Sequence, residues 1–397
     1  MNRFKEPFFS FVLRALIVFG WMGLIFGLLY LPHFLPKTTA RLTKKSIDIF
    51  CWPDMFLPET LAEFEAQTGI KVIRHYYTTN EEMLIKLKAT KGQGYDLVIP
   101  SDYAVKPLIA HRLLKPLDHS KFLYAHTLHP RLIGHDYDPT LAYSLPFQWD
   151  IFAFGVNCDG FQGDLTELSW SHIFEENKLD GSIAMTFDPV EAISFASYYL
   201  FDHADYLNEA QKTAVLNLLK TQKKWVDNYS ALRGDYFLAT KNCRLAVCLS
   251  SHLFRSSLNY PHTRIVIPRD RQIVSIENVA IPVGSKKDDL VYQFLNFIYT
   301  PKTMAKDCTA FLVFPATIDA LPLIDAPPSF KDIFTQSLKN PRCFAFVKPV
   351  LKEQEARDLW IKTRSFWVDG GVKKKTKRAP FCHTKKIPTQ QPEAAHG

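Results

Sequence analysis

The sequence predicts an α/β fold built around a parallel sheet. Between Ile47 and Leu113, short apolar runs alternate with segments of helical periodicity, and most of these helical segments have a recognisable start or stop signal. Aromatic and polar residues follow the apolar runs directly. Strands that alternate with helices form parallel sheets, which bind ligands beyond the carboxyl ends of their strands. We therefore expect a ligand cleft at this edge of the sheet.

The first strand is predicted over Ile47–Trp52, and Pro53 ends its pairing because proline has no N–H. A helix is expected over Pro58–Thr68, since Leu61 and Phe64 share a face and Gly69 supplies a left-handed stop. The next strand is Lys71–Ile73. Each of these elements is short, as expected of a compact α/β unit.

The pattern then repeats twice. Thr79 or Asn80 is placed to cap a helix whose apolar side recurs at helical spacing, with Met83, Leu84 and Leu87. Tyr95–Pro100 reads as a third strand, and Ser101 is placed to cap the helix that carries Val105, Leu108 and Leu113.

Charge is unevenly distributed along the 397 residues, whose formal net charge is +8. Residues 1–45 and 373–397 each carry roughly +6, which leaves residues 46–372 at about −4. The folded part is therefore mildly acidic and can attract a cation. Nucleic-acid binding is not predicted, because the basic excess lies in the two tails.

The amino terminus has an apolar run from Ala15 to Leu31, preceded by Arg3, Lys5 and Arg14. The run is long for a signal peptide and slightly short for a membrane span. Residues 1–45 are therefore expected to be an export signal; an uncleaved anchor in the inner membrane is favoured over cleavage near Thr38–Ala40. Residues 371–397 have the composition of a disordered basic tail.

Motifs of common enzyme classes are absent from the sequence, including nucleophile-elbow, zinc-protease, P-loop and dinucleotide patterns. The seven cysteines show no CxxC spacing, and His126, His129 and His135 follow no recognised metal pattern. We therefore expect neither a metal site nor a cofactor. Cys243 and Cys248 are the nearest pair if a disulfide forms.

Several motifs in order resemble the spermidine/putrescine-binding proteins of polyamine ABC transporters. They are Trp52 to Tyr103, with Thr68–Ile73, Asn80–Met83 and Tyr95–Ser101 inside it, then Tyr143–Trp149, Gly155–Asn157, Gly181–Ser182, Asp188 with Glu191, and Glu277–Pro282. The resemblance covers roughly residues 46–370. It implies a two-lobed periplasmic-binding-protein fold of type II, with two crossover strands as the hinge.

The resemblance also implies the domain limits. One lobe would comprise residues 46–151 and 278–340, and the other would comprise 152–277 and 341–370. Phe152–Val156 and Val279–Pro282 would be the hinge strands. Closure of the lobes around a ligand would be the signal that a transporter reads.

A polyamine needs carboxylates for its ammonium groups and apolar or aromatic walls for its methylene segments. The resemblance, together with the strand ends, points to nine ligand-binding residues: Trp52, Asp54, Ser101, Asp102, Tyr103, Asp188, Glu191, Glu277 and Phe314. Where the family usually has aromatic walls, this chain has Met55, Leu249 and Ser275. The site is therefore expected to hold fewer rings than its relatives.

Structural roles compete for some of these residues. Asp188 precedes Pro189 and is a natural helix cap. Trp52 on its own would more often be a core residue. Glu277 lies in the apolar run Ile273–Ile281, so it needs a partner, either a bound cation or an internal salt bridge.

The predicted function is capture of a polyamine outside the cytoplasm and its delivery to the membrane permease subunits of an ABC transporter, without catalysis. Two alternatives stay open. The same fold can bind another cationic ligand or a metal, or the cleft can belong to an enzyme acting on a cationic heterocycle, with Cys51 beside Trp52 as nucleophile.

Overall fold

The computed structural model describes residues 45–159, 161, 163–175, 182–230, 233–339 and 344–365, together with 16, 19–23 and 26. The predicted anchor at residues 1–45 lies almost wholly outside these ranges, and the predicted tail at 371–397 lies wholly outside them. No helix within the described ranges is both long enough and apolar enough to cross a membrane.

The strands are β1 (Ser46–Cys51), β2 (Lys71–Tyr76), β3 (Leu97–Val98), β4 (Ser144–Asn157), β5 (Ile183–Thr186), β6 (Val226–Ser230), β7 (Leu245–Leu249), β8 (Thr263–Val266), β9 (Gln272–Ala280), β10 (Phe314–Pro315) and β11 (Phe344–Phe346). The helices are α2 (Pro58–Thr68), α3 (Asn80–Thr90), α4 (Asp102–Ala110), α5 (Ser171–Phe174), α6 (Pro189–Phe201), α7 (Glu209–Gln222), α8 (Gly234–Ala239), α9 (Ser250–Asn259), α10 (Asp288–Ile298), α11 (Pro301–Phe311), α12 (Pro328–Lys339) and α13 (Glu353–Arg364).

The local signals of the first half account for most of its elements. Gly69 adopts a left-handed φ of 70° and ends α2 at the predicted residue. Thr79 accepts a hydrogen bond from the backbone N–H of Glu82 and so caps α3. The third strand is shorter than predicted, covering only Leu97–Val98. Ser101 precedes α4 but makes no capping hydrogen bond, because its hydroxyl is engaged elsewhere.

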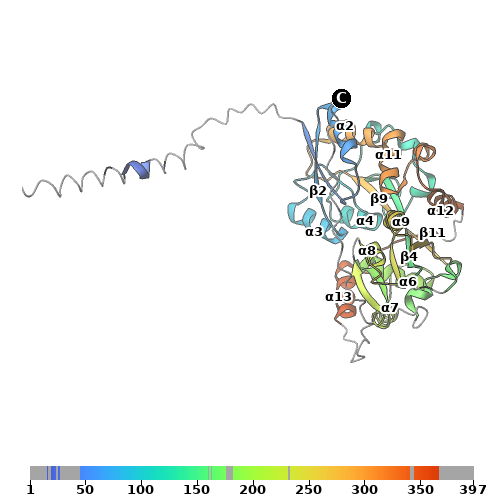
Figure 1. Ribbon diagram of the computed structural model, residues 1–397. Coiled ribbons are helices and arrows are strands. Elements are labelled where there is room, and N and C mark those ends of the chain that lie inside the picture. Colours follow the sequence, from blue (N-terminus) through green and yellow to red (C-terminus); the bar gives the residue numbers. More distant parts are fainter. Residues whose placement is uncertain are drawn as a thin grey trace, which may run out of the picture.

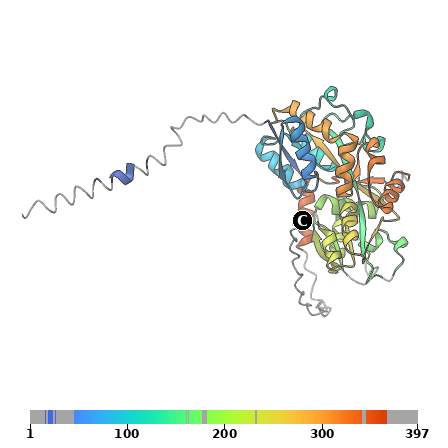
Figure 2. The same cartoon turned by 45° about the horizontal axis from the view of Figure 1, so that its top comes forward.

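From residue 45 onward, the described part of the chain forms two lobes (Figures 1 and 2). The first lobe contains β1 to β3 with α2, α3, α4, α10 and α11, and the second contains β5 to β7 with α6, α7, α8 and α13. The strands form one sheet in the order β2-β1-β3-β9-β4-β7-β5-β6, to which β8, β10 and β11 add. The prediction of an α/β fold is confirmed.

The strands β4 and β9 run antiparallel to each other and connect the two lobes. The first half of β4 pairs with β9 and β10, and its second half pairs with β7 and β8. All residues of β4 are buried, including its polar residues Ser144, Gln148, Asp150 and Asn157. At its other end β9 reaches the first lobe, where Ala280 pairs with Val98 of β3. These strands therefore position residues midway between the lobes.

The start of β4 is held by a buried carboxylate. Asp138 is only 4% exposed, and its oxygens accept hydrogen bonds from the backbone N–H groups of Ala142, Tyr143 and Ser144 at 2.8–2.9 Å. The hydroxyl of Ser144 donates a fourth bond at 3.0 Å. One side chain thereby satisfies three backbone donors at the entrance to the crossover strand.

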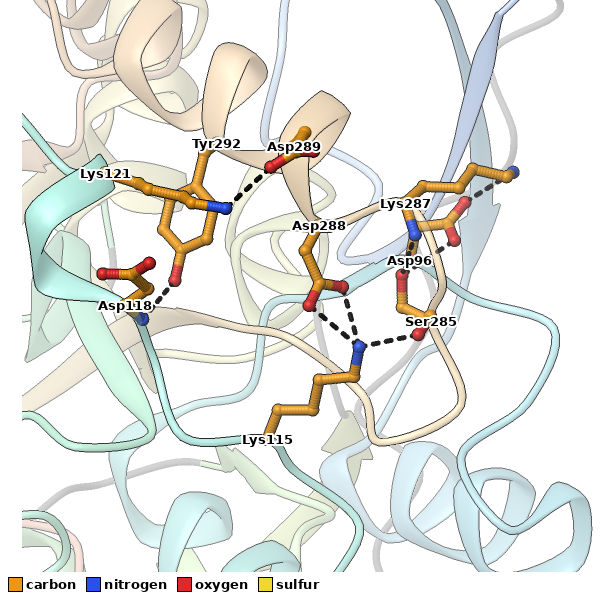
Figure 3. A network of polar contacts seen from close by, with 9 residues as sticks. All are labelled: Asp96, Lys115, Asp118, Lys121, Ser285, Lys287, Asp288, Asp289 and Tyr292. Carbon is orange, nitrogen blue, oxygen red and sulfur yellow. Dashed lines mark hydrogen bonds and ion pairs between the residues drawn. The ribbon is translucent and has the colours of Figure 1, made fainter.

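A polar network fixes the first lobe at the amino ends of β1 and β3 (Figure 3). Asp96 accepts bonds from the ammonium of Lys287 at 2.8 Å and from the hydroxyl of Ser285 at 3.0 Å. Lys115 donates to Asp288 at 2.8 Å, and Lys121 donates to Asp289 at 2.7 Å. Both of these acceptors lie in the first turn of α10. Its position opposite the carboxyl ends of the strands gives it a structural role.

Candidate ligand-binding site

A cavity of ≈ 580 Å³ lies between the lobes and is called the central cavity below. Its lining residues come from the carboxyl ends of β1 and β3, from the middle of β4 and β9, and from α6 and α9. Five of the nine predicted ligand-binding residues line it: Trp52, Asp54, Ser101, Glu191 and Glu277. This is the edge of the parallel strands at which ligands bind in α/β sheets.

Glu277 lies at the centre of the cavity's hydrogen-bonding groups. Its Oε2 accepts from the indole N–H of Trp52 at 2.7 Å, and its Oε1 accepts from the hydroxyls of Ser101 at 2.8 Å and Ser275 at 3.3 Å. These donors come from β1, the start of α4 and β9, so three elements orient one carboxylate. No ion pair joins Glu277 to a basic side chain among the residues that the structure describes.

Burial raises the pKa of Glu277 to about 7, and the nearby Asp150 adds to this rise, while the hydrogen bonds from Ser101, Trp52 and Ser275 oppose it. Desolvation disfavours the charged form of a carboxyl group, which a bound cation would favour. Glu277 therefore titrates near neutral pH in the ligand-free protein, and a cation in the cavity would stabilise its ionised form.

Glu191 faces the cavity from α6. The hydroxyl of Thr186 donates to its Oε2. Burial, and then repulsion from Asp188, raise the pKa of Glu191 well above its ordinary value. This carboxyl group thus has one neutral donor and no basic partner among the described ion pairs, and it is available to a ligand on the side opposite Trp52.

The mouth of the cavity holds an internal ion pair. The guanidinium of Arg255 on α9 lies 3.3 Å from Asp54, and it also donates to the carbonyl of Phe311 at 3.4 Å. Asp54 is more than half exposed, at 61%. The cavity therefore contains a cation of its own that competes for one of the predicted carboxylates.

Two further carboxylates line the cavity but were not among the nine predicted residues. Asp150 is buried and accepts bonds from the hydroxyl of Ser250 and from the backbone N–H of Ser251. Asp235 lies in the first turn of α8, with a guanidinium nitrogen of Arg233 3.4 Å away. In the sequence Asp235 is an acid in the first turn of a short helix, a common stabilising arrangement, so no signal marked it as a cavity residue.

Asp102, Tyr103 and Asp188 do not line the central cavity. They line a second cavity of ≈ 640 Å³, which shares no lining residue with the first. The hydroxyl of Tyr103 on α4 donates to Asp188 Oδ2 at 3.0 Å, and Asp188 Oδ1 caps α6 by accepting from the N–H groups of Val190 and Glu191. The helix-cap interpretation of Asp188 is confirmed.

Phe314 lies in the core instead of the cavity. Its side chain is fully buried and packs on Trp149 with ring centroids 4.7 Å apart, and on Phe330 at 4.6 Å. The neighbouring Val313 lines the cavity in its place. Successive residues of an extended segment point in opposite directions, so a one-residue shift in the alignment assigns a core side chain to the cavity wall.

Four aromatic residues line the central cavity, namely Trp52, Trp149, Phe152 and Tyr260. Met55, Leu249 and Ser275, which stand where the family usually has rings, all line it. Trp52 is the ring that contacts Glu277, and it packs on Tyr77 with centroids 4.5 Å apart. The substitutions identified in the sequence thus fall on the cavity surface.

The described residues include no group of three or more His, Cys, Asp or Glu side chains arranged to hold a metal ion. Cys51, the nucleophile of the enzyme alternative, is buried, and this burial raises its pKa to about 12. A thiol with that pKa is scarcely ionised at neutral pH. Cys243 and Cys248, the pair considered for a disulfide, are both free.

Comparison with known proteins places this geometry in a family. The profile of the bacterial extracellular solute-binding proteins matches residues 59–332. The chain belongs to this family. Its fold is the two-lobed periplasmic-binding-protein fold that the sequence predicted, with β4 and β9 as the crossover strands.

Individual relatives agree with this assignment. The chain is 28% identical over 269 residues to the spermidine/putrescine-binding periplasmic protein of Salmonella typhimurium, covering 66% of this chain and 75% of the relative. It is 26% identical over 332 residues to the putrescine-binding periplasmic protein PotF of Escherichia coli, covering 77% and 90%. Both relatives are named as binding proteins, and neither name is that of an enzyme.

The crystal structure of the spermidine/putrescine ABC transporter substrate-binding protein PotD from Streptococcus pneumoniae superposes with a TM-score of 0.69 and 20% identity. The match covers 81% of this chain and 98% of that structure. At this identity the likeness establishes the fold, and ligand identity has to be argued from the cavity itself.

Proposed function

We propose that this protein is an extracytoplasmic solute-binding protein that captures a polyamine, spermidine or putrescine, in the central cavity and delivers it to the permease subunits of an ABC transporter. The observation that carries the proposal is the arrangement of Asp54, Glu191 and Glu277 around one cavity. The names of the two relatives, each a binding protein for spermidine or putrescine, support the same ligand class.

The chemistry of the cavity fits an elongated cation. Glu277 with Trp52 offers one ammonium site, in which a carboxylate and an aromatic face act together. Glu191 offers a second from the other lobe, and Asp54 a third at the mouth. Between them the walls of Met55, Phe152 and Leu249 suit methylene segments. A chain with several ammonium groups would draw both lobes onto itself.

The transporter would then recognise the closed arrangement of the two lobes. We place the lobe boundaries at 46–151 with 278–340, and at 152–277 with 341–370, because β4 and β9 cross between the lobes near these limits. A ligand that contacts Glu277 on the crossover strand and Glu191 on α6 binds the closed arrangement more tightly than the open one. We further propose that residues 1–45 hold the protein at the outer face of the inner membrane.

A second ligand class follows from the two arginines, Arg233 and Arg255, that line the same cavity. Their guanidinium groups would suit the carboxylate of an ω-amino acid, whose amine would meet Glu277. Both arginines already lie within 4 Å of a carboxylate of the cavity, Asp235 and Asp54 respectively, which favours the polyamine.

Calorimetric titration of the purified full-length protein tests the proposal. Spermidine and putrescine are compared with 4-aminobutanoate, thiamine and phosphate as ligands. Saturable binding of a polyamine with a Kd near 1 μM, about −8 kcal/mol, is expected. Binding of 4-aminobutanoate in preference to both polyamines would instead assign the arginines to the ligand.

Variants separate ligand contacts from structural roles. Replacing Glu191 and Glu277 together by Gln should weaken polyamine binding by at least about 3 kcal/mol, because each ion pair with an ammonium is lost. Glu63→Gln is the matched control, since Glu63 lies on α2 and pairs at 3.6 Å with Lys306. Unchanged affinity in the double variant would remove the carboxylates from the binding site.

A further inference from the structure

Helices α3 and α13 belong to different lobes, yet their charged side chains are paired with each other. α3 lies in the first lobe and α13 in the second, on the same side of the molecule (Figure 1). The paired residues are Glu81 and Lys88 of α3 and Glu353 and Arg357 of α13, called the α3–α13 clamp below. They are not among the described residues that line the central cavity, so ligand capture there does not account for them.

The clamp contains two ion pairs that cross between the lobes. The ammonium of Lys88 lies 2.8 Å from a carboxylate oxygen of Glu353. Two nitrogens of the Arg357 guanidinium meet one oxygen of Glu81, at 2.7 and 2.9 Å. Arg357 also pairs at 3.1 Å with Glu353, one turn earlier on its own helix. The four charges therefore form one connected network, which contributes more than an isolated surface pair.

Each helix is fixed in its own lobe by its apolar side. Met83 and Leu87 of α3 are buried, and this helix packs beside α4 of the first lobe. Leu359 and Trp360 of α13 are buried, and this helix packs on α6 and α7 of the second lobe. The charged sides of the two helices can therefore meet only while the lobes lie together.

Neighbouring residues on the same helices pair within a single lobe. Glu355 of α13 pairs at 2.9 Å with Lys212 of α7. Lys86 of α3 pairs at 2.7 Å with Glu82, one turn away on the same helix. Lys86 and Glu355 thus lie two residues from Lys88 and Glu353, carry the same charges, and make no pair between the lobes among the described residues. They supply matched controls for the clamp.

The clamp is exposed enough to respond to salt. Its side chains are 31–42% exposed, and charges at this exposure are screened by dissolved ions. The Lys88 ammonium, with Arg357 adding to its effect, holds the pKa of Glu353 below its ordinary value. Glu353 is therefore ionised near neutral pH, and the strength of the clamp varies with ionic strength.

We propose that the α3–α13 clamp holds the two lobes together in the absence of ligand, so that ionic strength determines how far the ligand-free protein opens. A ligand in the central cavity then completes a closure that the clamp already favours. Its affinity increases in proportion to the fraction of the ligand-free protein that is closed. This effect on affinity rests on the proposed function, whereas the effect on the ligand-free protein does not.

Small-angle scattering of the full-length protein without ligand tests the clamp, at about 0.02 M and about 0.5 M NaCl. We expect the radius of gyration of the native protein to increase with salt. The clamp variant replaces Glu81, Lys88, Glu353 and Arg357 together by Gln, which leaves the net charge unchanged. It should have the expanded radius already at low salt and lose most of the salt dependence. A native radius that is independent of salt and equal to that of the clamp variant would overturn the inference.

The control variant replaces Glu82, Lys86, Lys212 and Glu355 by Gln, which again leaves the net charge unchanged. It should behave as the native protein does, because these residues pair within one lobe. Equal expansion in the clamp and control variants would refute the clamp. Thermal melting shows whether both are folded, and Arg357→Gln alone, with an intermediate expansion expected, keeps the test decisive if the fourfold clamp variant unfolds.

Titration with spermidine separates this inference from the proposed function. The clamp variant should bind spermidine about two- to tenfold more weakly than the control variant. If spermidine binds none of these proteins, the polyamine proposal fails and scattering alone decides the clamp. If spermidine binds the clamp and control variants equally and their radii agree, the clamp is refuted and the polyamine proposal stands.

Discussion

The hydroxyl of Tyr103 donates to Asp188 Oδ2 at 3.0 Å, and this bond joins the first turn of α4 to the cap of α6. It connects the two lobes without any ligand atom, and both residues line the second cavity. A contact made only when the lobes are together biases the protein toward closure.

The variant Tyr103→Phe removes this bond while keeping the ring. Since a hydrogen bond to a charged group contributes about 1.5–3 kcal/mol, we expect polyamine affinity to fall by about tenfold or more. The matched control is Tyr292→Phe, which loses a bond to Asp118 within one lobe. If Tyr103→Phe and Tyr292→Phe bind the polyamine with equal affinity and small-angle scattering shows equal compaction, the Tyr103–Asp188 bond does not contribute to lobe closure.

Polyamine binding should depend on pH through Glu277, whose pKa is about 7 in the ligand-free protein because of burial. Below this pH the carboxyl group is protonated and cannot pair with an ammonium. Affinity should therefore fall as the pH is lowered, with a slope that approaches about tenfold per pH unit. Above it Glu277 is ionised and adds no further dependence. Titrations between about pH 5.5 and pH 8, in buffers of different ionisation heat, would detect the proton released at binding.

Glu277→Gln provides the comparison for this pH dependence. The variant should bind more weakly at every pH and lose the part of the slope centred near 7. A slope identical to that of the native protein would mean that another group, such as Glu191 with its raised pKa, controls the titration.

The internal ion pair between Arg255 and Asp54 should oppose ligand binding. Arg255→Gln removes a positive charge from the cavity and frees Asp54, and we expect polyamine affinity to rise by about two- to fivefold, the range of a partly exposed ion pair. Arg269→Gln is the control, because Arg269 pairs with Glu167 on the surface. Weaker binding in Arg255→Gln would show that the arginine contacts the ligand itself.

Leu249→Trp should restore an aromatic wall to the central cavity. A ring placed against an ammonium adds about 0.5–2 kcal/mol, so calorimetry should record a gain of roughly two- to thirtyfold. Leu258→Trp serves as the control, since Leu258 is 64% exposed on the same region of the chain and outside the cavity. A loss of affinity in Leu249→Trp alone would mean that the space is already needed by the ligand.

Asp138→Ala should destabilise the fold without touching either cavity. Three backbone N–H groups at the start of β4 lose their acceptor, and a cost of about 3 kcal/mol or more is expected. Asp136→Ala, at an exposed neighbour, should change the free energy of unfolding by less than about 0.5 kcal/mol. Urea denaturation followed by tryptophan fluorescence measures both.

Local signals in the sequence were sufficient for much of the first lobe. Gly69 and Thr79 act through the backbone of their own helices, so the positions of α2 and α3 follow from neighbouring residues alone. The third strand is shorter than its apolar run, although the backbone N–H groups of Asp96 and Ile99 on either side of it still donate to carbonyls of β1. The side chain of Asp96 is held by Lys287 and Ser285, which are distant in sequence and so leave no local signal.

The candidate site was predicted less completely, for a geometric reason. Trp52, Ser101 and Glu277 meet as expected, but Asp102 and Tyr103 follow Ser101 into a helix, where each residue turns about 100° from the last. Adjacent positions consequently face different cavities. The position of Asp235 depends on the packing of α8 against β7, which no local pattern in the sequence records.

The chain leaves the first lobe through β4 and re-enters it through β9, whose Ala280 pairs with Val98. Before β9 has been synthesised, β3 has a strand neighbour only on its β1 side. The strands β5, β6 and β7 lie between β4 and β9 in the sequence and can already pair with one another. Pairing between such distant residues forms late in folding. We therefore expect the first lobe, where the described strands begin, to be completed last. The pairing of β9, which carries Glu277, would be the folding step that joins the two lobes and completes the central cavity.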